Sequence, residues 1–121
     1  MSKNSIKNNL FRHRRRAFYR FFGKGKYKTH SQYVYNLYTQ CLKPYGSVDL
    51  DNYVYIIEKF IGEQAIKSDY EIVRDINSST KQYEEWRNKV AQHTGLSVET
   101  YRLGIIFFSA DFAKQAHVLR W

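Results

Sequence analysis

Cysteine is nearly absent from this chain, where Cys41 is the single example. One cysteine cannot form an intrachain disulfide or build a cysteine-based zinc site. We therefore expect the cytoplasm or another reducing compartment. Long hydrophobic runs are also missing: the longest apolar run extends only from Gly104 to Ala110. A membrane-spanning helix needs about 20 apolar residues, so the sequence predicts no transmembrane segment.

Acidic residues are missing from the first 48 positions, which carry eleven Lys and Arg. The following 73 residues carry nine basic and eleven acidic side chains. The formal net charge of +9 is therefore a local property of the amino-terminal part of the chain. Such segregation indicates an anionic partner for that part.

The size of the chain limits it to one hydrophobic core. At 121 residues, with 43% apolar and 17% aromatic residues, it can form one small domain with an arm. We divide it into a basic arm over residues 1–28 and a compact domain over residues 29–121.

The arm has the pattern of an amphipathic basic helix. Between Ser5 and Phe22, apolar residues gather on one side and arginines on the other, and a Gly/Lys loop over residues 23–28 follows. Cations spaced along a helix suit a phosphate backbone, and interleaved aromatic rings suit unpaired bases. The predicted nucleic-acid-binding residues are Lys7, Arg12, Arg14, Arg15, Arg16, Tyr19, Arg20, Lys24, Lys26 and Lys28. An acidic protein, a lipid surface or organellar targeting are alternative explanations of the same pattern.

Helical periodicity recurs through the rest of the chain. It predicts helices from Thr29 or Ser31 to residue 42, from Ser47 or Asp49 to Gly62, over residues 68–76, from Ser79 to residue 94, and over residues 97–116. No convincing pair of strands is apparent. The predicted fold is therefore all-α, a bundle of about five or six helices.

Residues 90–102 resemble the helix-turn-helix motif of bacterial and phage DNA-binding proteins. The resemblance is carried by Ala91, Gly95 and the Leu96-Ser97 pair, and it implies possible base readout by Ser97, Thr100 and Arg102. Gly104 departs from the motif, and the following segment is too apolar to face a DNA groove. A plain corner between two helices is the preferred interpretation.

Catalytic patterns are weak. Four carboxylates lie near expected helix starts, where capping and the helix dipole explain them: Asp49, Asp51, Glu84 and Glu85. The four histidines lack metal-ligand spacing, Cys41 lies on an apolar helix face, and Asp111 suits a structural ion pair. We expect neither enzymatic activity nor a cofactor or metal.

These observations predict a non-enzymatic nucleic-acid-binding protein with an architectural, packaging or accessory role. A sequence-specific helix-turn-helix regulator and a protein-binding module, inhibitor or nucleoprotein subunit are the alternatives. The strongly apolar segment after residue 100 suggests a homo-oligomer or a larger assembly. The sequence pattern does not distinguish DNA from RNA, or single from double strands.

Overall fold

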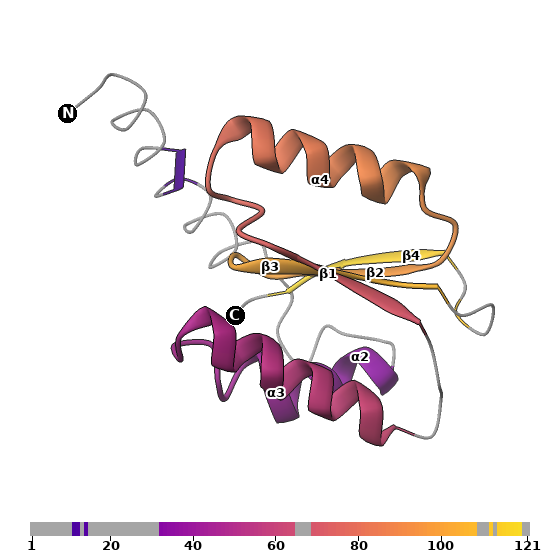
Figure 1. The fold of residues 1–121 in the computed structure, drawn as a ribbon. Coiled ribbons are helices and arrows are strands. Elements are labelled where there is room, and N and C mark those ends of the chain that lie inside the picture. The colour runs from indigo at the N-terminus through magenta and orange to yellow at the C-terminus, as the bar shows by residue number, and fades with distance from the viewer. Residues whose placement is uncertain are drawn as a thin grey trace.

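The computed structural model describes residues 11–12, 14, 32–64, 69–108, 112 and 114–119. Within them the chain forms a four-stranded mixed sheet with helices on both faces (Figure 1). In chain order the elements are α2 (Gln32–Leu37), the π-helix η2 (Tyr38–Leu42), α3 (Leu50–Glu63), β1 (Tyr70–Arg74), α4 (Thr80–Gln92), β2 (Leu96–Glu99), β3 (Leu103–Phe107) and β4 (Gln115–Val118). The prediction of an all-α bundle is therefore wrong.

The sheet has the strand order β1-β3-β2-β4. Strand β3 runs antiparallel to both β1 and β2, and β4 runs parallel to β2. Ile105 of β3 lies opposite Ile72 of β1 and Val98 of β2, so these side chains share one face. The next residue, Ile106, belongs to the other face.

The predicted helices over residues 68–76 and 97–116 are absent from the described structure, and the physical reason is clearest for the second. Residues 70–74, 96–99 and 103–107 form strands that contribute side chains to both covered faces of the sheet, and all five residues of β3 are buried. A strand buried on both sides has a continuous apolar run instead of an alternating one. Such a run is hard to distinguish from a buried helix by periodicity.

The larger core lies between the sheet and the layer of α2, η2 and α3. Buried apolar side chains of these helices pack with Val98, Ile105 and Phe107 of the sheet. Asp49 caps α3, because its side chain accepts a hydrogen bond from the backbone N–H of Asn52. The predicted helices in this part of the chain are confirmed.

The smaller core lies under α4, on the opposite face (Figure 1). Trp86 and Val90 of α4 pack there with Ile76 and Ile106. The predicted start of this helix is confirmed, because Ser79 caps α4 and its side chain accepts a hydrogen bond from the N–H of Gln82. The sheet is thus the middle of three layers.

Candidate functional site

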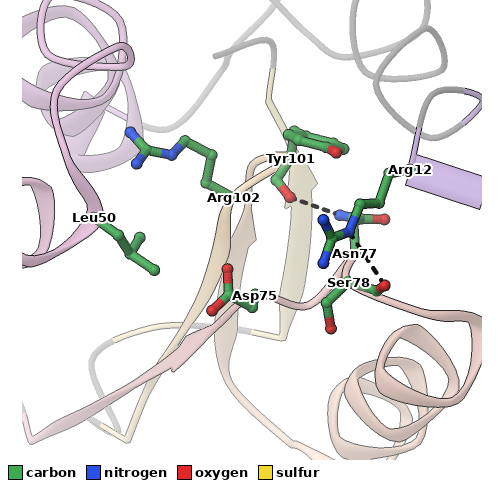
Figure 2. Close-up of a pocket in the computed structure, with 7 residues that line it drawn as sticks. All are labelled: Arg12, Leu50, Asp75, Asn77, Ser78, Tyr101 and Arg102. Carbon is green, nitrogen blue, oxygen red and sulfur yellow. Dashed lines mark hydrogen bonds between the residues drawn. The ribbon is translucent and has the colours of Figure 1, made fainter. Parts of the chain in front are cut away.

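A pocket of about 210 Å³ opens at one end of the sheet (Figure 2). It lies where β1 ends, next to the turn that joins β2 to β3 and the start of α3. Arg12 joins it from the amino-terminal region. The lining residues are Arg12, Leu50, Asp75, Asn77, Ser78, Tyr101 and Arg102.

The floor of the pocket is a turn held by backbone bonds. The N–H of Asp75 donates to the carbonyl of Arg102 at 2.9 Å, and the N–H of Ser78 donates to the carbonyl of Asp75 at 3.0 Å. Asn77 is buried, and its side-chain amide donates to the carbonyl of Tyr101 at 2.9 Å (Figure 2). The turn after β1 is thereby fixed against the turn between β2 and β3.

Asp75 has the unusual backbone of this turn. Its φ is 55°, in the left-handed region that most residues other than glycine avoid and that aspartate tolerates better than most. Its carboxylate forms no hydrogen bond or ion pair with any residue that the structure describes. It therefore supplies a free acceptor at the pocket.

Arg12 supplies the cation of the pocket. Its Nε donates to the carbonyl of Ser78 at 3.3 Å, and the side chain is exposed (Figure 2). Phe11, Arg12 and Arg14 have helical conformation, as predicted. Neither Arg12 nor Arg14 forms an ion pair with a described residue. The other predicted contact residues lie outside the described part of the chain: Lys7, Arg15, Arg16, Tyr19, Arg20, Lys24, Lys26 and Lys28.

Arg102 lines the pocket, but its guanidinium is engaged elsewhere. It donates to the carbonyls of Gly46, at 2.9 Å, and Val48, and it lies 5.1 Å from the centre of the Tyr53 ring. These contacts tie the turn between β2 and β3 to the loop that follows η2. Arg102 is thus a bridge between the two segments.

Residues 90–102 do not form a helix-turn-helix motif in this fold, because α4 is followed by strand β2 and not by a recognition helix. Ser97 lies in β2 and is 3% exposed, and Thr100 is fully buried. The N–H of Thr100 donates to the carbonyl of Leu103 at 2.9 Å and closes the turn between β2 and β3. These side chains, proposed for base readout, are packed inside the domain.

A buried carboxylate that the sequence analysis did not single out lies under α4. Glu99 is 3% exposed, and its carboxylate contacts the Tyr83 hydroxyl at 3.3 Å and the Arg87 guanidinium at 3.4 Å. Both partners come from α4, on the face of the sheet opposite the larger core. This cluster connects α4 to β2 and lies apart from the pocket.

The remaining candidate reactive groups have structural surroundings. Burial raises the pKa of the Cys41 thiol to about 11, so the thiol is protonated at neutral pH and is a poor nucleophile. Asp51 forms an ion pair with Arg74, and Glu84 and Glu85 are exposed on α4. Among the described residues, no three His, Cys, Asp or Glu side chains gather into a metal-binding group. Asp111 lies outside the described residues.

Three ion pairs are present among the described residues. Besides the pair of Arg74 with Asp51, ion pairs join Arg87 to Glu99 and Lys89 to Glu71.

No helix in the described part of the chain has the length and apolar character needed to cross a membrane.

Comparison with known proteins adds no relative: no family model, curated protein or solved structure matches the chain significantly.

The polar residues that form the pocket were largely missed in the sequence. A usable sign was the run Asp75 to Ser79, in which four of five residues are Asp, Asn or Ser. These residues favour turns because their side chains bond to nearby backbone. The run predicts a turn, but its proximity to Tyr101 and Arg12 depends on the sheet.

Proposed function

We propose that this chain is a non-enzymatic nucleic-acid-binding protein that contacts the phosphate backbone through its basic amino-terminal segment. The observation that carries the proposal is the charge distribution, with eleven Lys and Arg and no acidic residue among the first 48 positions. A polyanion with regularly spaced charges is the partner that such a segment suits best.

Two described residues of the basic segment support the proposal through their exposure. Arg12 and Arg14 are exposed, and neither forms an ion pair with a described residue. Exposed lysines elsewhere in the described structure also lack ion pairs, but there the chain carries acidic residues as well, whereas the first 48 positions carry none. The charge of Arg12 and Arg14 is therefore available to an external anion.

The proposal is tested by measuring affinity against salt. We expect fluorescence anisotropy to detect binding of labelled duplex DNA, single-stranded DNA or RNA, with affinity that falls steeply as salt rises. If about six phosphates are neutralised, log K against log salt should have a slope of about −5 on duplex DNA and about −4 on single strands. The order of the three affinities identifies the preferred strand type.

A matched pair of variants locates the contact surface. Arg15→Ala/Arg16→Ala should make the slope on duplex DNA shallower by about 2, since each lost contact contributes about 0.9. Lys59→Ala/Lys114→Ala removes the same charge from exposed positions of the body and should leave the slope unchanged. Equal effects of the two variants, or wild-type protein that binds anionic vesicles but no polynucleotide, would contradict the proposal.

A further inference from the structure

The pocket at the end of the sheet contains one hydrogen-bond acceptor, the Asp75 carboxylate, and one donor group, the Arg12 guanidinium, that are available to a ligand. The Asp75 carboxylate has no bonding partner among the described residues, and Arg12 uses its Nε on the carbonyl of Ser78. The terminal nitrogens of the Arg12 guanidinium have no described acceptor. Figure 2 shows these two side chains around the same opening.

The charges in the pocket disfavour two common ligand classes. A phosphate would have the Asp75 carboxylate beside it, and the Nη1 atom of Arg102 already donates to the carbonyls of Gly46 and Val48. A divalent cation would find one carboxylate in the pocket and the Arg12 guanidinium beside it, whereas such ions need several oxygen ligands. The pocket therefore suits a neutral ligand that has both hydrogen-bond donors and acceptors.

An unpaired nucleic-acid base has this chemistry, and guanine fits it best. Its Watson–Crick edge presents two adjacent donors, N1–H and the N2 amino group, which one carboxylate can accept together. Its O6 and N7 atoms are acceptors that arginine commonly contacts. Bases of single strands are recognised in this way, through edges that pairing does not occupy.

We propose that this pocket binds one unpaired guanine, with Asp75 accepting from N1 and N2 and Arg12 contacting the acceptor atoms. The inference rests on the proposed function, because the basic segment that includes Arg12 would hold the strand from which the base projects. Backbone contacts then provide affinity, and the pocket provides a preference for one base.

The test compares short oligothymidine strands that carry a single central dG, dA or dC. We expect the full-length protein to bind the dG strand about tenfold more tightly than the other two, within the range of a bidentate base contact. Asp75→Asn should reduce this preference to about twofold or less, since the amide keeps one acceptor and loses the charge. Asparagine also tolerates the left-handed backbone of this position.

Asp51→Asn is the matched control, because it removes an exposed carboxylate near the same end of the molecule but outside the pocket. It should keep the preference for dG. Wild-type protein that binds all strands equally, or Asp75→Asn protein that keeps its preference, would overturn the pocket assignment and leave the proposed function intact. Failure to bind any of these single strands in dilute salt would overturn the pocket assignment, and failure to bind duplex DNA and RNA as well would overturn the proposed function.

Discussion

Gly104 is the residue at which the packing of α4 on the sheet is most constrained. A Cβ atom built there would lie 2.4 Å from the nearest ring carbon of Trp86, and the indole is 2% exposed. The ring packs with Ile76, Val90 and Ile106, so moving it would disturb the smaller core. We expect Gly104→Ala to lower the free energy of unfolding by about 1–3 kcal/mol, as overpacking does, measured by urea denaturation.

Gly62 provides the control for this prediction. It lies near the end of α3, and nothing stands within 4 Å of a Cβ atom built there. Alanine is the better helix former, so Gly62→Ala should raise the free energy of unfolding by up to about 1 kcal/mol. Destabilisation of similar size by both substitutions would show that the Trp86 contact is not the cause.

Tyr53, which is buried, and Tyr33, which is half-buried, differ in what their hydroxyls contact. The Tyr53 hydroxyl donates to the carbonyl of Leu42 at 2.8 Å, whereas the Tyr33 hydroxyl is buried with no hydrogen-bond partner in the described structure. We expect Tyr53→Phe to cost about 1–3 kcal/mol, because it leaves a buried carbonyl without this donor. Tyr33→Phe should change stability by less than about 0.5 kcal/mol, since it removes an unsatisfied group.

The same denaturation measurement separates the two tyrosine variants. The ring of Tyr33 makes edge contacts with Phe60, Phe107 and Phe112, and phenylalanine preserves them. A loss on Tyr33→Phe as large as that on Tyr53→Phe would mean that the Tyr33 hydroxyl has a partner.

At the scale of elements, the sequence predicts the helices well and the strands badly. Helices α3 and α4 have a capping residue and an apolar stripe of helical period, and both features are local. Strand β3 depends on partners that are distant in sequence, namely β1 and β2. Its all-apolar sequence fits a buried helix equally well, so local pattern could not decide.

The candidate site was predictable to a similar degree. The contribution of Arg12 follows from charge, which is visible in the sequence. The contribution of Asp75 and Asn77 follows from the turn after β1, and that strand was predicted as a helix. Their position opposite the turn between β2 and β3 is a consequence of sheet pairing, which single-residue propensities do not encode.

The cap of α4 provides a prediction at this scale. Ser79 begins the helix with a side-chain bond to the N–H of Gln82 at 3.2 Å. We expect Ser79→Ala to lower the free energy of unfolding by about 1 kcal/mol, as the loss of a cap usually does. Ser47→Ala is the control, because Asp49 and not Ser47 caps α3. Equal losses would contradict the assignment of Ser79 as the cap.

At the scale of the whole molecule, the larger core contains groups that ionise at high pH, among them Cys41 and Tyr33. Burial raises the pKa of the Cys41 thiol from 9.0 to about 11 and that of Tyr33 from 10.0 to about 12. Both groups keep their protons in the folded state at a pH where the unfolded chain loses them.

The stability of the fold should therefore fall at alkaline pH. A group whose pKa is raised by folding contributes its full stabilisation below its unfolded pKa, and the contribution is lost as pH rises through the folded value. We expect the free energy of unfolding to decline from about pH 9 through Cys41, and further above about pH 10 through Tyr33. Urea titrations at a series of pH values measure this decline.

Cys41→Ala isolates the thiol contribution to this decline. The variant should be less stable at neutral pH, because it leaves a small cavity in the larger core, but its stability should change less between about pH 9 and pH 10 than that of the wild type. Tyr33 still ionises in the variant, so the decline above about pH 10 should persist. Identical pH profiles for the two proteins would mean that Cys41 ionises equally in the folded and unfolded states, contrary to its burial beside α3.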